Sequence, residues 1–219
     1  MPTYSQGPRL LKGAIVAIDP ATSGRSTIVF QYNPETVKRS LEPQLAGAEG
    51  GQRSLAVRYS GAPVETIDLE VTIDAVDQLE AGQGAALGLG IHPQLAALET
   101  LLYPHSGQVE QNGRLLDRGS LEIAPYVAPL TLFIWGGNRV LPVSLTRYSI
   151  SEELFDSHLN PIRATVTLGL RALSYSDVDS SHPAYHLFLA YQQAKETMAR
   201  QGVTSSPNEL VGVDVGRLR

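Results

Sequence analysis

Apolar and polar residues alternate along much of the chain with a period of two, which is typical of β-strands. Between residues 67 and 73, every second residue is isoleucine, leucine or valine, and the residues between them are polar. A similar alternation runs through residues 163–172. Successive side chains of a strand point to opposite faces, so both segments are predicted to be half-buried strands. Weaker patterns indicate further strands at about 11–18, 26–32 and 54–59.

Turn residues divide the strands from one another. Gly136-Gly137-Asn138 lies between two apolar segments and predicts a hairpin. Pro142 falls in the returning strand, and because proline has no backbone donor, it favours an edge strand or a bulge there. The Gly/Ala-rich residues 82–90 are predicted to be irregular, as are residues 106–120, which contain the tight-turn signal Asn112-Gly113.

Two segments carry the helical period instead. His92-Pro93 opens the first, with proline at an early helical position where its missing N–H is harmless, and Pro104 ends it. The second runs from Pro183 to about Ala199, with one apolar face. The order of elements predicts a mainly β protein, built on antiparallel strands with one inserted and one terminal helix.

Composition narrows the class of protein. The 219 residues can form one or two domains, and we expect a β domain over 1–178, a helix over 179–200 and an extended tail over 201–219. The hydrophobic share of 42% with a net charge of -5 indicates a globular chain. A pI near 5.5 argues against a nucleic-acid partner. The absence of cysteine excludes disulfides, Cys-ligated zinc and thiol catalysis.

The sequence shows no apolar run of membrane-spanning length and no pattern of a secretory signal. We therefore expect that the protein does not insert directly into a membrane. We also expect that it assembles in the cytoplasm.

Candidate catalytic and ligand-binding motifs are weak. His182 and His186 are four residues apart, as two metal ligands on a helix would be, but Pro183 lies between them and the zincin motif is absent. The acidic residues between Glu152 and Asp156 are compatible with a bound cation or, more simply, with a solvated turn. No nucleophile, base and orienting group come together, so we expect neither an enzyme nor a bound cofactor or metal.

Two Asn-Pro pairs stand at strand boundaries. Asn33-Pro34 follows the apolar segment that begins at Thr27, and Asn160-Pro161 directly precedes the strand over residues 163–172. Proline fixes its own φ and favours extended backbone at the residue before it, so each pair ends or starts a strand sharply. On composition alone, two ordinary turns are the favoured interpretation of these pairs.

In their order and spacing, five segments resemble the tube-adaptor proteins of contractile injection systems, which are phage-tail-like particles. The segments are Thr27–Glu35, Glu65–Asp74, His92–Leu102, Pro129–Gly136 and Phe155–Leu170. The resemblance covers most of residues 10–175. It implies a tail-tube-like antiparallel β-barrel or sandwich with one flanking helix. Members of this family often carry a C-terminal LysM domain, whose βααβ pattern is not visible in this sequence.

The resemblance also implies a role. Six copies would form a ring that joins the inner tube protein to the spike hub and baseplate proteins. Asn33 and Pro34 would end a ring-forming strand, and Asn160, Pro161 and Arg163 would shape a subunit contact. The alternative is a monomeric β-sandwich module that binds a carbohydrate or peptide.

That alternative requires an exposed aromatic platform. The chain has one tryptophan and scattered tyrosines. We expect the tryptophan, Trp135, to pack in the hairpin rather than to bind a ligand.

Overall fold

The computed structural model describes residues 11–19, 24–46, 58–76, 86–119 and 128–202, and its body is a seven-stranded antiparallel sheet. The strands are β1 (Ala14–Ile18), β2 (Arg25–Val29), β3 (Val37–Glu42), β4 (Val64–Asp74), β5 (Leu130–Ile134), β6 (Val140–Phe155) and β7 (Pro161–Ala172). The helices are α2 (Ala86–Leu89), α3 (His92–Glu99), α4 (Ser106–Asp117) and α5 (Pro183–Gly202). The predicted mainly β class with minor α content is confirmed.

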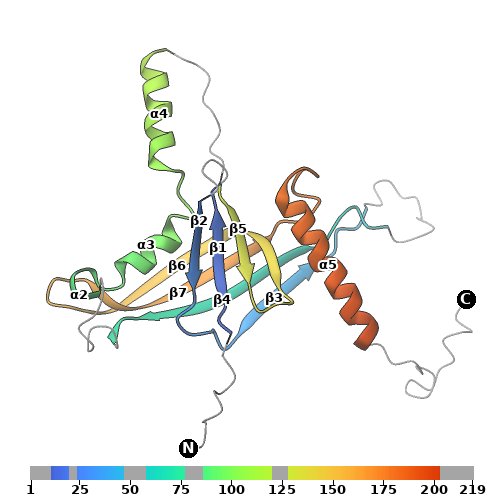
Figure 1. The fold of residues 1–219 in the computed structure, drawn as a ribbon, viewed down its shortest axis with the longest axis horizontal. Coiled ribbons are helices and arrows are strands. Elements are labelled where there is room, and N and C mark those ends of the chain that lie inside the picture. Colours follow the sequence, from blue (N-terminus) through green and yellow to red (C-terminus); the bar gives the residue numbers. More distant parts are fainter. Residues whose placement is uncertain (1–10, 20–23, 47–57, 77–85, 120–127, 203–219) are drawn as a thin grey trace, which may run out of the picture.

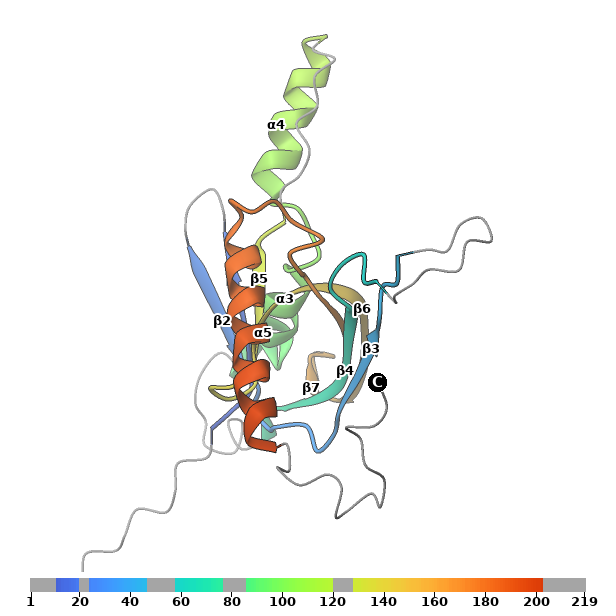
Figure 2. The same ribbon diagram turned by 90° about the vertical axis from the view of Figure 1, so that its right-hand side faces the viewer.

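The sheet order is β2-β1-β5-β6-β7-β4-β3, and the sheet curls around its core without closing into a barrel. Figures 1 and 2 show β1, β2 and β5 on one side of the curl and β4 and β3 on the other. The end strands β2 and β3 are not paired with each other. The concave side holds the core, where Phe133, Leu141 and Leu168 are fully buried.

The two clearest alternating segments form the centre of one half of the sheet, as predicted. In β4, Ile67, Leu69 and Val71 are buried, whereas the intervening polar residues, Glu65 excepted, are partly or fully exposed. β4 pairs antiparallel with β7, with Ile67 opposite Leu170 and Val71 opposite Val166. Apolar burial from both strands thus contributes to one continuous core.

The predicted hairpin joins β5 to β6, and the stretch around Pro142 contains a bulge but is not an edge strand. β6 lies inside the sheet, and its irregular register occurs between Leu145 and Arg147 rather than at the proline. The strand changes partner near Val143, pairing with β5 before it and with β7 after it. Pro142 therefore lies where the ladder to β7 is only beginning, and its carbonyl accepts a hydrogen bond of 2.8 Å from the N–H of Leu173.

The helices α3 and α5 confirm the two predicted helices. α3 begins at His92 and buries Leu95 and Leu98. α5 begins at Pro183 and buries one apolar face against the core, including Phe188.

Two segments predicted to be irregular contain helix. Residues 106–120 include the twelve-residue α4, and residues 82–90 include the short α2. The Asn112-Gly113 pair sits within α4, where Asn112 is buried rather than forming a turn. A two-residue turn signal is weak against a helical segment around it, which explains the error. Most of the tail expected over 201–219 lies outside the described residues.

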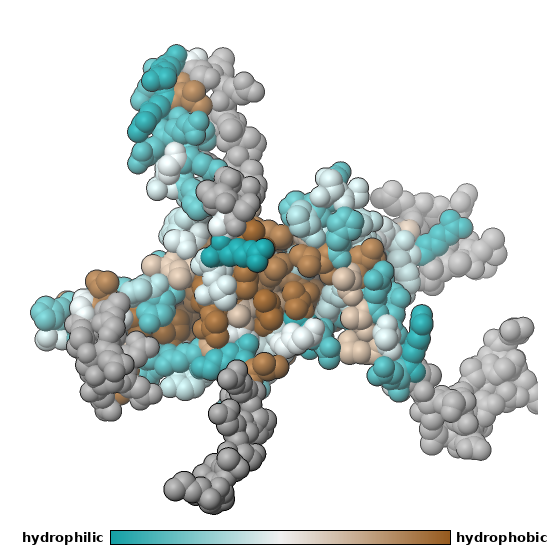
Figure 3. Space-filling model, in the orientation of Figure 1, coloured by the Kyte–Doolittle hydropathy of each residue, from teal (hydrophilic) through white to brown (hydrophobic). Residues whose placement is uncertain are grey.

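Apolar side chains are not confined to the concave side. The outer face of β1 and β5 carries Val16, Leu132 and Ile134, which are only half-buried. Figure 3 shows this face as an apolar area over the central strands. In the described part of the chain, no helix is long and apolar enough to span a membrane.

Candidate assembly surfaces

The first Asn-Pro pair fastens the end of β2 to the start of β1. The side chain of Asn33 accepts a 2.8 Å hydrogen bond from the N–H of Gly13 and donates one of 2.8 Å to the carbonyl of Leu11. Pro34 is half-buried beside it. These contacts lie within one chain, so Asn33 and Pro34 set the path of the backbone at this end of the sheet.

The second pair shapes the turn between β6 and β7. Asn160 donates a 2.8 Å hydrogen bond from its amide to the carboxylate of Asp156, whose other oxygen accepts the N–H groups of His158 and Asn160. The amide of Asn160, and then these backbone N–H groups, hold the pKa of Asp156 below its ordinary value. The carbonyl of Pro161 accepts the N–H of Ile91 at 2.9 Å, which ties the turn to the start of α3.

One residue near each Asn-Pro pair contacts Asp74, the last residue of β4. The guanidinium of Arg163 binds the carboxylate of Asp74 at 2.6 Å and 2.7 Å. The side-chain amide of Gln31, two residues before Asn33, donates to the backbone carbonyl of Asp74 at 2.7 Å and accepts its N–H at 2.9 Å. The structure therefore links the predicted positions through Asp74. From the sequence, Asp74 was expected only on the outer, polar face of its strand, and Gln31 was not predicted to take part.

The β6–β7 turn presents apolar side chains to solvent. Leu154, Phe155 and Leu159 are more than half exposed, Leu159 to 79%, and Leu89 of α2 is exposed as well. We call these four residues the tip. Leu154 and Leu159 have positive φ angles of 54° and 65°, which are unusual for bulky residues. The tip was not predicted, although three apolar residues in and beside a predicted solvated turn were a possible signal.

An apolar groove lies between α5 and the β3–β4 end of the sheet, and it encloses about 460 Å³. Its walls include Leu41 of β3, Tyr59 and the rings of Tyr175, Phe188 and Tyr191. Tyr175 and Tyr191 both lie edge-on to Phe188, with ring centroids 5.7 Å and 6.2 Å away. Leu41 and Tyr59 remain exposed, Tyr59 to 71%. We call this feature the groove.

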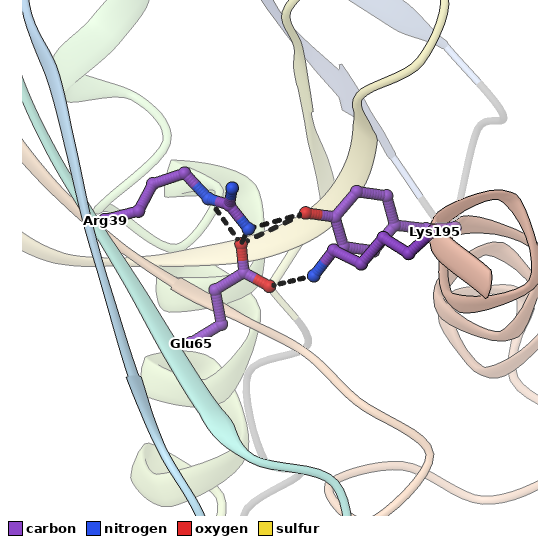
Figure 4. Close-up of polar contacts among 4 residues, drawn as sticks. Arg39, Glu65 and Lys195 are labelled. Atoms are coloured by element: carbon purple, nitrogen blue, oxygen red, sulfur yellow. Dashed lines mark hydrogen bonds and ion pairs between the residues drawn. The ribbon is translucent and has the colours of Figure 1, made fainter. Parts of the chain in front are cut away.

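A buried carboxylate lies beneath the groove. The side chain of Glu65 is 1% exposed, and it binds Arg39 at 2.5 Å and Lys195 of α5 at 3.1 Å, as Figure 4 shows. The hydroxyl of Tyr191 lies 3.2 Å from the same carboxylate. Burial alone would raise the pKa of Glu65, but the hydrogen bonds and charges of Arg39 and Lys195 outweigh it and hold the pKa below its ordinary value of 4.5. This cluster anchors α5 to β3 and β4.

The lowered pKa of Glu65 predicts a pH dependence of stability. The ion pairs of Glu65 contribute fully to the free energy of unfolding at pH values above its ordinary pKa. This contribution is lost as the pH falls through the lower pKa that Glu65 has in the folded state. The Glu65→Gln variant should therefore be less stable than the wild type at neutral pH, and the difference should shrink as the pH falls below the ordinary pKa of Glu65 and through its lower, folded-state pKa. Urea unfolding at several pH values measures it. A difference that stays constant with pH would contradict the assignment.

The two histidines make contacts within their own segment, at the start of α5. The Nδ1 atom of His182 accepts the N–H of Ala184 at 3.2 Å, and the ring of His186 lies edge-on to Tyr185. Among the residues that the structure describes, no group of histidine and acidic side chains could hold a metal ion.

Trp135 packs in the hairpin, as expected. Its ring stacks on Phe133, with centroids 6.0 Å apart, and lies against the core.

Residues 10–179 match the family model described as contractile injection system tube protein. No curated protein sequence matches the chain. Two similar solved structures are the tail of an empty gene transfer agent particle, computed with C6 symmetry, and the six-fold symmetrised baseplate of the anti-feeding prophage. The first is 14% identical, covers 73% of this chain and 90% of the other, and has a TM-score of 0.27. The second is 16% identical, covers 77% and 93%, and has a TM-score of 0.25.

Proposed function

Because this chain belongs to the contractile injection system tube protein family, a family of structural tube components, we propose that it forms a ring joining the inner tube to the spike and baseplate. The observation that carries the proposal is the family match, which spans all seven strands of the sheet. Six copies per ring is the number that the sequence resemblance implies. The partners would be the tube protein above the ring and the spike hub and baseplate proteins below it.

The two end strands suit ring formation. β2 and β3 are the ends of the sheet, and no described strand pairs with the outer edge of either. An unpaired edge can accept a strand from another chain, and a ring of head-to-tail subunits would cover both edges at once. In this arrangement, Asn33 and Pro34 fix the chain just after the β2 edge.

The apolar outer face of β1 and β5 also favours a subunit over a monomer. Large exposed apolar areas on a protein commonly mark interaction sites. The alternative of a carbohydrate- or peptide-binding module has less support, because Trp135 packs against Phe133 and does not offer an open platform.

The position of the chain in a particle tests the proposed adaptor role. Immunogold labelling of purified particles with an antibody to this chain should mark one end of the inner tube, at the junction with the spike. Deleting the gene should leave no complete sheathed particles, and the wild-type gene supplied in trans should restore them.

Two results would contradict the adaptor role. Gold along the whole tube would identify the main tube subunit instead, and normal particles in the deletion would remove the structural role altogether. Assembly in the cytoplasm belongs to the same proposal, and labelled particles inside intact cells would be its signature.

A further inference from the structure

The tip and the groove lie at opposite ends of the molecule. Figure 1 shows α2 and the β6–β7 turn at the left end of the longest axis, and β3 with α5 towards the right. The tip is an apolar projection, and the groove is an apolar recess lined by aromatic rings. One surface is therefore convex and the other hollow, and both are present on every copy of the chain.

The charges beside the two surfaces are opposite. In residues 149–160, every side chain with a formal charge is acidic: Glu152, Glu153 and Asp156. At the other end, Glu65 lies between two cations, so the cluster under the groove keeps one net positive charge. Arg58, next to the groove residue Tyr59, adds an exposed positive charge at this end.

The backbone of the tip is held in an unfavourable conformation. Positive φ angles at leucine persist only where the surrounding structure imposes them, and such residues cluster at functional sites. Here the constraint comes from Asp156, which fixes the turn through Asn160 and the N–H of His158. Leu154 and Leu159, which flank this turn, are both exposed to solvent.

We propose that the tip of one copy docks into the groove of the next copy of this chain. The apolar side chains of the tip would pack against the aromatic walls of the groove, and the acidic residues beside the tip would face the basic residues beside the groove. The inference rests on the proposed ring and names a contact within it. A tip on one end and a groove on the other make a heterologous contact, which is the kind that closes into rings. Asn160 and Pro161 then act by shaping the tip, as the sequence analysis expected of a subunit contact.

The absence of cysteine from the chain permits a direct test. Chains carrying only Leu159→Cys are mixed with chains carrying only Tyr59→Cys, assembled, and treated with a short bis-maleimide. Two cysteines held close together at one contact have a high effective concentration for the cross-linker. We therefore expect at least about ten-fold more cross-linked dimer than in the control. The control mixture pairs Leu159→Cys with Tyr103→Cys, a residue of similar exposure that lies in neither surface.

A charge exchange gives the second readout. Glu152→Lys with Glu153→Lys should abolish assembly, and adding Arg58→Glu in the same chain should restore it in part. Loss without rescue, or no loss at all, would overturn the proposed contact. A Tyr59 mixture that cross-links no better than the Tyr103 control would do the same.

The two proposals can fail separately. If wild-type particles contain this chain at the tube end but the cysteine pair does not link, only the tip–groove contact is wrong. If no particle contains the chain, the ring itself is wrong.

Discussion

Replacing Arg39 and Lys195 together with methionine should lower the free energy of unfolding by about 3–5 kcal/mol. Methionine keeps most of the aliphatic length of both side chains, but it leaves the Glu65 carboxylate buried without a cation. A buried charge that loses its partners is costly, and the pKa of Glu65 should rise until the group takes up a proton. Urea unfolding followed by circular dichroism measures the loss.

A third substitution separates charge from packing. Adding Glu65→Met to the double variant should recover most of the lost stability, because an apolar set of similar volume often replaces a buried ion cluster without loss. The matched control is Arg114→Met, which removes an exposed ion pair with Glu110 in α4. That change should alter the free energy of unfolding by less than about 0.5 kcal/mol. A double variant that is as stable as Arg114→Met would contradict the assignment.

Gly90→Ala should also be strongly destabilising. Gly90 has a φ of 55°, and a Cβ atom there would overlap the carbonyl oxygen of Pro161. The backbone conformation alone costs about 1–3 kcal/mol for a residue with a side chain, and the overlap adds to this. Thermal and urea unfolding would measure the effect, and the β6–β7 turn should lose protection from hydrogen exchange first.

Gly88→Ala is the matched control two residues away. Gly88 lies in α2 with no atom close to the position of a new Cβ. Alanine favours helix over glycine, so the variant should be unchanged or slightly more stable. Equal losses for Gly88→Ala and Gly90→Ala would show that the close approach to Pro161 is not what requires glycine.

Local patterns in the sequence predicted the centre of the fold well. β4 and β7 were predictable because their alternation reflects one buried and one polar face, which any half-buried strand must have. α3 and α5 were predictable from proline at the helix start and an apolar stripe. β3 was not predicted, because at the end of the sheet it buries little and so carries no apolar pattern.

The candidate surfaces were less predictable because they join distant segments. The groove combines Leu41, Tyr59 and Phe188, which come from three parts of the chain. Glu65 lies in phase with the apolar residues of β4, but its partners Arg39 and Lys195 come from β3 and α5, which only the fold brings together. By contrast, the Asn-Pro pairs were found from the sequence because proline acts on its own neighbours, although their link through Asp74 depends on the fold.

The order of strands has a consequence during synthesis. β1 and β2 form a local hairpin, but the other neighbour of β1 is β5, which begins 112 residues after Ile18. At typical translation rates, the hairpin waits about 6–20 s for β5 to be made. Through that interval the apolar edge of Ala14–Ile18 is open to other nascent chains. Exposure of this one hairpin during synthesis would then lower the yield of correctly folded chains.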